Sequence, residues 1–332
     1  MRRALGAFVL VVALAAGAQA QESHLLVIVG LGGDPENSAL FHKWASALVD
    51  TARVQFLLPA ESVIYLGEDP ARDPKRINGR STRQEIEAAV DRLAARARPG
   101  DQVFIVLIGH GASAAGEARF NLPGPDLGVQ DYARLVARFA AETVVFVNTA
   151  SASGGFVSAL AGPNRAVITA TRTEGERNQT RFGEFITGAF ANAEADLDKD
   201  GRVSLFEAFT WARQHAMESY EKERQIPTEH PVIDDDGDGK GSDEPGKDGT
   251  DGALARTVFL APDPGARAAA AVTDPALRAL YEERRAIEGR ISLLKASKDR
   301  LGEADFDRQM EQLLLDLAKK NREIREKEKK RP

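Results

Sequence analysis

The sequence contains no cysteine among its 332 residues. Disulfide frameworks, thiolate zinc sites, iron–sulfur clusters and cysteine nucleophiles are therefore excluded, because each of them needs a thiol. The residues that are present are 43% hydrophobic and 28% charged. This composition is typical of a globular protein with enough apolar residues for a sizeable core, organised as two domains or as one domain with an appendage.

Long apolar runs are also scarce, and the one at the N-terminus has the features of a secretory signal peptide. Arg2 and Arg3 precede an apolar run at 4–16, and Ala18-Gln19-Ala20 forms a small-residue cleavage site. The run is shorter than the ~20 residues of a membrane-spanning helix. An uncleaved anchor is the alternative. We expect cleavage after residue 20, no membrane anchor in the mature chain, and a soluble protein in the periplasm or outside the cell.

The mature chain begins with apolar runs that alternate with helical patterns, which predicts an α/β fold with a mostly parallel sheet covered by helices on both faces. Helices are expected at 36–51, after the caps at Ser81 or Thr82, and at 129–140. The predicted sheet has six strands: Leu25–Val29, Val63–Leu66, Val103–Ile108, Thr143–Val147, Arg165–Thr171 and Thr257–Leu260.

The predicted α/β domain spans 21–261 and includes an acidic, loop-rich insertion at 172–256. A linker at 262–274 leads to residues 275–332, whose apolar residues have heptad-like spacing. Gly302 interrupts the pattern, which favours a helical hairpin that self-associates or packs on the acidic body. The tail carries a net charge of +4, which we interpret as such a packing surface or a solvated face; nucleic-acid binding is not indicated.

Residues 196–207 match the twelve-position EF-hand loop. Gly201 allows the sharp turn at position six, and hard oxygen ligands in this number favour Ca²⁺ over zinc. An acidic surface turn without an ion is the alternative. The predicted ligands are the side chains of Asp196, Asp198, Asp200, Ser204 (through water) and Glu207, and the carbonyl of Arg202.

A second acidic segment begins at Asp234 with the same Asp-x-Asp-x-Asp-Gly start. Its candidate ligands are Asp234, Asp236 and Asp238. Pro245 stands where the twelfth-position glutamate belongs, so a solvated acidic loop is the competing interpretation.

Two predicted neighbouring strands end in reactive side chains. Gly109-His110-Gly111 follows one strand, and Ala150-Ser151-Ala152-Ser153-Gly154 follows the other. Ligands bind at the carboxyl ends of strands in open parallel sheets, which makes His110 and Ser151 candidate site residues. A purely structural role is the alternative for each of them.

At these two segments the sequence resembles the caspase-like peptidases, and among them the legumain-type branch. In that family a His-Gly pair ends the third strand and an Ala-Cys-x-Ser-Gly pattern ends the fourth, so Ser151 stands at the cysteine position. The resemblance covers about 24–171 and 257–260. It implies a caspase-like sandwich in which His110 is the general base, Ser151 the nucleophile position, and the amides of Gly111 and Ser151 the oxyanion hole.

The serine makes activity doubtful, because a hydroxyl needs a well-oriented base where a thiolate does not. Asp34, at the tip of the first strand, is the one carboxylate that the sequence places nearby to orient His110; a helix cap is its alternative role. We favour a secreted calcium-binding pseudopeptidase that binds or scaffolds a protein or peptide. The alternatives are a hydrolase that uses His110 and Ser151, and a calcium-responsive interaction module that uses the hairpin.

Overall fold

The structure, a computed structural model, describes most of the chain after residue 20. The described residues are 21–114, 116–139, 142–247, 250–262, 272, 274–296 and 301–329. The predicted signal peptide and most of the predicted linker lie outside them. No helix within these ranges is long and apolar enough to span a membrane.

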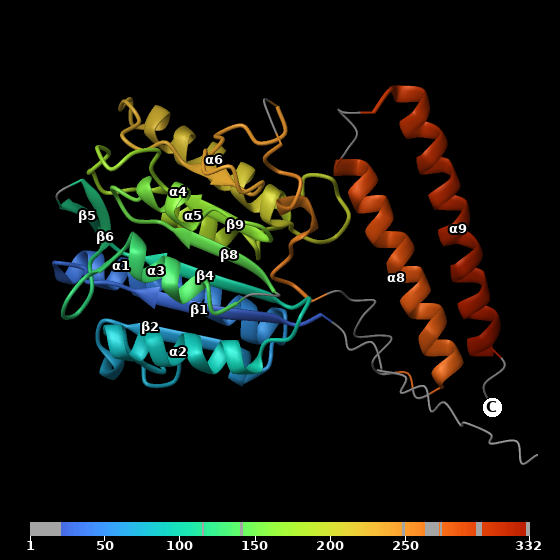
Figure 1. The fold of residues 1–332 in the computed structure, drawn as a ribbon, viewed down its shortest axis with the longest axis horizontal. Helices are drawn as coiled ribbons and strands as arrows, with labels where there is room; N and C mark the ends of the chain where they lie inside the picture. The colour runs from blue at the N-terminus through green and yellow to red at the C-terminus, as the bar shows by residue number, and fades with distance from the viewer. Residues whose placement is uncertain are drawn as a thin grey trace, which may run out of the picture.

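The centre of the molecule is a seven-stranded sheet in the order β10-β9-β8-β4-β1-β2-β3 (Figure 1). All neighbours are parallel except β10, which is antiparallel to β9. The central strands are continuous apolar runs because both faces of the sheet are covered. The strands are β1 (Ser23–Val29), β2 (Val63–Gly67), β3 (Gly79–Arg80), β4 (Gln102–Ile108), β8 (Thr143–Asn148), β9 (Arg165–Thr169) and β10 (Val232–Asp234).

Helices cover both faces of this sheet. Alternate residues of β1 belong to two cores, with Leu25 and Val27 in one and Leu26 and Ile28 in the other. The first core is closed by α1 (Pro35–Asp50), α5 (Phe182–Ala189) and α6 (Leu205–Lys222). The second is closed by α2 (Arg83–Arg96), α3 (Val129–Val136) and α4 (Gly155–Leu160).

Short elements complete the body. A small antiparallel sheet consists of β5 (Gly111–Ala114), β6 (Glu117–Phe120) and β7 (Leu127–Gly128). The 3-10 turns are η2 (Ala60–Ser62), η3 (Pro70–Arg72), η4 (Ala193–Ala195) and η5 (Ala255–Thr257), and η1 (Thr51–Gln55) is a π turn.

The prediction of Thr257–Leu260 as the sixth strand is wrong. Residues 255–257 form η5, and Phe259 makes only an isolated bridge, to Ser204. The backbone of Phe259 is held by side chains at the base of the sheet, since its amide donates to Gln102 Oε1 (3.0 Å) and its carbonyl accepts from Ser23 Oγ (3.3 Å). The sheet has seven strands because β3 and β10 take its edges. The helix predicted at 129–140 ends at Val136.

The 172–256 segment, predicted as a loop-rich insertion, contains two helices and a strand. Its helices α5 and α6 pack on each other through Phe182 and Phe209 (ring centroids 6.1 Å apart), and both share a core with α1. It also supplies β10 to the main sheet. The segment is thus part of the body.

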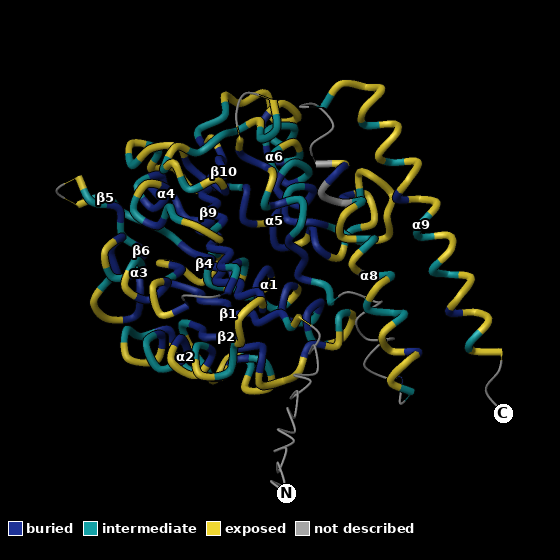
Figure 2. Tube along the Cα trace, turned by 45° about the vertical axis from the view of Figure 1, so that its right-hand side comes forward, coloured by how far each residue is buried: buried dark blue, intermediate teal, exposed yellow. Residues whose placement is uncertain are grey.

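The C-terminal residues form two helices, α8 (Pro275–Ala296) and α9 (Glu303–Lys329), that pack against each other. Leu277 and Ile324 are buried between them, and the Tyr281 hydroxyl donates to Glu328 (2.6 Å). Figures 1 and 2 show α8 between α9 and the body, and α8 contacts η5.

Candidate functional site

The 196–207 loop connects α5 and η4 to α6. Ser204 caps α6 by accepting from the Glu207 amide (3.2 Å), and the Glu207 carboxylate accepts from the Ser204 amide (2.8 Å). This reciprocal cap explains why the helix begins at residue 205. It places positions nine and twelve of the predicted loop in direct contact at the N-terminus of α6.

Backbone amides fix the acidic side chains of this loop. Asp196 accepts from the amides of Asp200 (3.1 Å) and Gly201 (3.0 Å), and Glu207 Oε1 accepts from those of Leu197 (2.9 Å) and Asp198 (3.1 Å). Gly201 has φ of +87°, the left-handed conformation that glycine adopts without strain.

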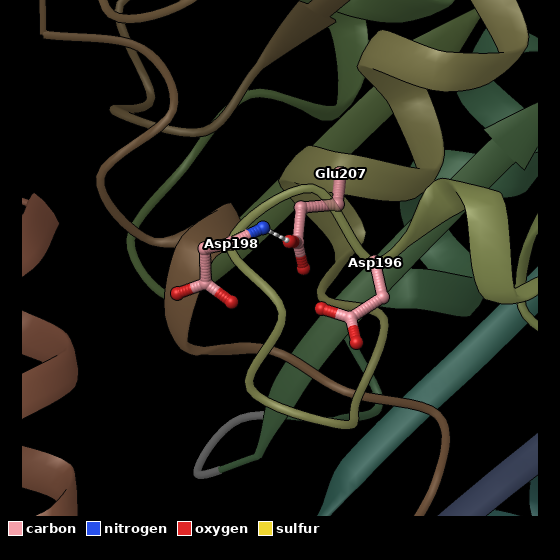
Figure 3. A group of neighbouring side chains, drawn as sticks. All are labelled: Asp196, Asp198 and Glu207. Atoms are coloured by element: carbon pink, nitrogen blue, oxygen red, sulfur yellow. Dashed lines mark hydrogen bonds between the residues drawn. The ribbon is translucent and has the colours of Figure 1, made fainter.

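Three of the predicted ligands converge. One carboxylate oxygen from each of Asp196, Asp198 and Glu207 lies within 4.8 Å of the other two (Figure 3). Asp200 lies beside them, where burial and then the charge of Asp198 raise the pKa of its carboxyl. Such a group of like charges in a half-buried site favours a divalent cation that binds oxygen.

The other two predicted ligands, Arg202 and Ser204, lie in the same loop. The Arg202 guanidinium points away from the acidic side chains, since it donates to the Ala261 carbonyl (3.0 Å) and stacks 3.7 Å from the centre of the Phe259 ring. The Ser204 hydroxyl is 2.8 Å from Glu207 Oε2. The amide after Ser204, that of Leu205, donates to Val258 (2.8 Å), so the segment that follows η5 supports this loop.

In the second acidic segment the structure brings Asp234 and Asp236 together with Asp251, which sequence reasoning missed. The three carboxylates have oxygens within 4.8 Å of one another. Asp234 and Asp251 are buried, whereas Asp236 is exposed. Asp238 is not in this group; its carboxylate accepts from the Lys240 amide (2.7 Å) and lies 3.4 Å from Lys240 Nζ.

Asp251 is held in place by Asp235. The Asp235 amide donates to Asp251 Oδ1 (2.9 Å), and the Asp235 carboxylate accepts from the amides of Gly252 and Ala255 (2.6 Å each). Burial, followed by the charges of neighbouring aspartates, raises the pKa of Asp251 to about 7. The pKa of Asp234 is also raised, mainly by burial.

His110 and Ser151 lie at the carboxyl ends of β4 and β8, which are paired neighbours in the sheet. The His110 ring is turned toward the loop after β1: its Nε2 is 3.2 Å from the Gly32 carbonyl, and it packs edge-on against Phe41 with ring centroids 5.0 Å apart. A carbonyl only accepts, so Nε2 carries the proton in this contact. His110 makes no hydrogen bond to Ser151 within the described part of the chain.

Ser151 contacts Gly111. Its hydroxyl donates to the Gly111 carbonyl (3.1 Å), and the Gly111 amide points at the same oxygen (3.5 Å). Ser151 is only 4% exposed. The turn after it contains Ala152 at φ of +53°, whose amide donates to the Glu176 carbonyl (2.7 Å). The loop after β9 thus braces the serine turn.

Within the described part of the chain Asp34 makes no hydrogen bond to His110. The Asp34 carboxylate caps α1 by accepting from the Asn37 amide and from Asn37 Nδ2 (2.8 Å each). These bonds, the amide first, hold the pKa of Asp34 below its usual value, and the charge of His110 is only the last of the causes that lower this pKa. Asp34 instead borders a cleft of about 600 Å³ at the ends of β1 and β2, whose lining includes His42 and Tyr65 but neither His110 nor Ser151.

Comparison with known proteins adds no family to this description: no protein-family model matches the chain, and no curated protein matches it. The interpretation of both candidate sites therefore rests on their residues and geometry.

Proposed function

We propose that this protein is a secreted or periplasmic calcium-binding pseudopeptidase, with a caspase-like α/β scaffold that binds or scaffolds a protein or peptide partner. The observation that carries the calcium assignment is the gathering of Asp196, Asp198 and Glu207 in a loop whose amides already fix those side chains. Little ordering remains for an ion to induce, which lowers the cost of binding.

Calcium suits this loop because its candidate ligands are all oxygens. The described ligand group contains no histidine, and the chain has no cysteine, which disfavours zinc and copper. Position-specific spacing supports an EF-hand, and the Ser204–Glu207 cap gives the exiting helix its expected start.

We propose a second calcium site at Asp234, Asp236 and Asp251. In this site Asp251 takes the role of the glutamate that Pro245 replaces at position twelve. Three carboxylates around one point, two of them buried, repel one another without a cation. Asp238 accepts a hydrogen bond from the Lys240 amide, and we do not include it among the ligands of this site.

Calorimetric titration with Ca²⁺ tests both sites. We expect two binding events in the wild-type protein, and in the Glu207→Gln variant the event at the 196–207 loop should be weaker by roughly tenfold or more because the loop loses a charged ligand. Glu194→Gln is the matched control: Glu194 is an exposed acid just before the loop, and its side chain is outside the cluster. Equal titrations for all three proteins would contradict the EF-hand assignment.

The scaffold assignment is supported by the sheet. Leaving aside the two-residue β3, β4 and β8 are the third and fourth parallel strands along the chain, and they are paired. His110 and Ser151 follow them, as the resemblance implies.

The contacts of Ser151 favour a non-catalytic role. Its hydroxyl donates to a backbone carbonyl, the His110 Nε2 is engaged by Gly32, and Asp34 caps a helix. A serine nucleophile needs a base within hydrogen-bond reach to take its proton. Here Ser151, His110 and Asp34 each have a structural partner instead of contacting one another as a nucleophile and its base would.

A fluorophosphonate probe tests this point. We expect the wild-type protein, with or without calcium, to be labelled no more than the Ser151→Ala variant. Labelling that is lost in both Ser151→Ala and His110→Ala would show an activated serine and would support the hydrolase alternative.

A further inference from the structure

Among the described residues, a lysine of the helical hairpin contacts the candidate calcium loop. Lys295, near the C-terminal end of α8, places its ammonium 2.7 Å from Asp198 Oδ2. The other oxygen, Asp198 Oδ1, accepts from the Asp200 amide (3.1 Å). Lys295 therefore pairs with the carboxylate oxygen that the loop itself does not use.

The contact lies at the candidate ion site. A cavity of about 180 Å³ is lined by a serine, three apolar side chains, three acids and two cations, the charged ones being Asp198, Asp200, Glu207, Lys295 and Arg256. Among the described residues, Asp198 is the partner of Lys295. Both side chains are 43% exposed, so solvent screens the pair.

We infer that Lys295 is a built-in competitor for calcium at the 196–207 loop, so that ion binding and hairpin docking oppose each other. The inference rests on the proposed calcium site. In the ion-free protein the ammonium neutralises Asp198; a bound divalent ion takes over that carboxylate and repels the ammonium. Calcium therefore loosens α8 from the loop.

The charges of the two parts support this coupling. The 275–332 tail carries a net +4, and the rest of the mature chain is strongly acidic. Within the hairpin, Leu277 packs against Ile324 and Lys320 pairs with Glu283, and these contacts do not involve the body. Loss of the Lys295 contact therefore weakens its docking while the hairpin stays folded.

The matched variants are Lys295→Met and Lys319→Met. Both remove one positive charge from the hairpin, but the side chain of Lys319 is 71% exposed and pairs with Asp316 within α9. Calcium titrations are run on the full chain carrying Asp251→Asn, so that the heat reports the 196–207 loop. At 0.15 M salt, charges beyond about 8 Å are screened.

We expect Lys295→Met to bind calcium roughly two- to fivefold more tightly than its parent, the range that a partly exposed ion pair accounts for. Lys319→Met should leave the affinity unchanged. Equal affinities in the parent and in Lys295→Met would overturn the inference and leave the calcium site intact. Absence of calcium binding in all three proteins would remove the calcium site and this inference together.

Hairpin docking has its own readout, because a cysteine-free chain accepts site-specific spin labels. Val54→Cys on the body and Leu314→Cys on α9 provide exposed positions (69% and 51%). We expect calcium to broaden the distance distribution between the two labels, and Lys295→Met to broaden it without calcium. A distribution that neither change affects, in protein that binds calcium, would overturn the coupling.

Discussion

Replacement of Asp251 by asparagine should stabilise the ion-free protein, and most of this advantage should disappear when calcium is added. The carbonyl oxygen of the new amide side chain can still accept from the Asp235 amide, so the hydrogen bond that holds residue 251 in place remains. The substitution removes the buried charge and replaces the other carboxylate oxygen with an amide nitrogen. The folded-state pKa is about 7 against an ordinary value of 3.8. The folded state therefore binds the proton more tightly than the unfolded state, and ion-free stability falls as the pH rises from about 4 to about 7.

The size of this effect follows from the displacement of the pKa. At 1.36 kcal/mol per pKa unit, the charge destabilises the ion-free protein by at most about 4 kcal/mol above pH 7. Asp251→Asn should recover part of that amount at pH 8 and almost none at pH 4. With calcium at about 100 times Kd, the wild-type site gains about 2.7 kcal/mol, most of which the variant forgoes.

Urea unfolding at pH 8 and pH 4, in chelator and in saturating calcium, measures these differences. Glu244→Gln is the control, because Glu244 is exposed in the same segment and pairs only with Lys247 among the described residues; its effect should stay within about 0.5 kcal/mol. The reasoning is refuted if Asp251→Asn destabilises the ion-free protein at pH 8, or if its effect is the same with and without calcium.

Two further substitutions test the local geometry by urea unfolding. Ser204→Ala removes the cap of α6 and should cost about 1 kcal/mol in chelator, whereas an unchanged midpoint would mean that Ser204 does not hold the Glu207 amide. Gly111→Ala would place a Cβ 2.3 Å from the Ser151 carbonyl and should cost about 1–3 kcal/mol. Gly188→Ala, in the open on α5, should instead stabilise by up to about 1 kcal/mol; equal effects of the two changes would contradict the packing at Ser151.

The central strands could be predicted from the sequence because their burial leaves a local signal. Each of β1, β4 and β8 is a continuous apolar run, and both faces of such a strand are covered. The 196–207 loop could also be recognised from the sequence, because its candidate ligands lie within twelve residues of one another. Its carboxylates converge through contacts between near neighbours, such as Asp196 with Gly201.

Other features depend on contacts that no local pattern encodes. β10 has three residues, too few for a periodicity, and its place is set by pairing with β9. Asp251 reaches the second acidic loop from outside its twelve positions, through the Asp235 clamp. The direction of the His110 ring is decided by Gly32, which is 78 residues away. The sequence placed His110 and Ser151 on neighbouring strands but could not orient them.

The apolar run at 257–260 shows why pattern alone misleads. Val258, Phe259 and Leu260 are buried, as residues of a strand would be, yet the run links other parts of the body. Val258 accepts from the Leu205 amide at the first acidic loop, and Phe259 is tied to Gln102 on β4.

Residues 251–257 connect the second acidic loop to the hairpin, and the Val258 carbonyl that follows them binds the Leu205 amide at the end of the first loop. Asp251 belongs to the second loop, the Ala255 amide binds Asp235, and η5 contacts α8. On the proposed function, an ion at either loop would act on one short segment, residues 251–258, that the hairpin also touches through η5. This shared segment would give calcium a physical route to the docking of α8, in addition to the competition proposed at Asp198.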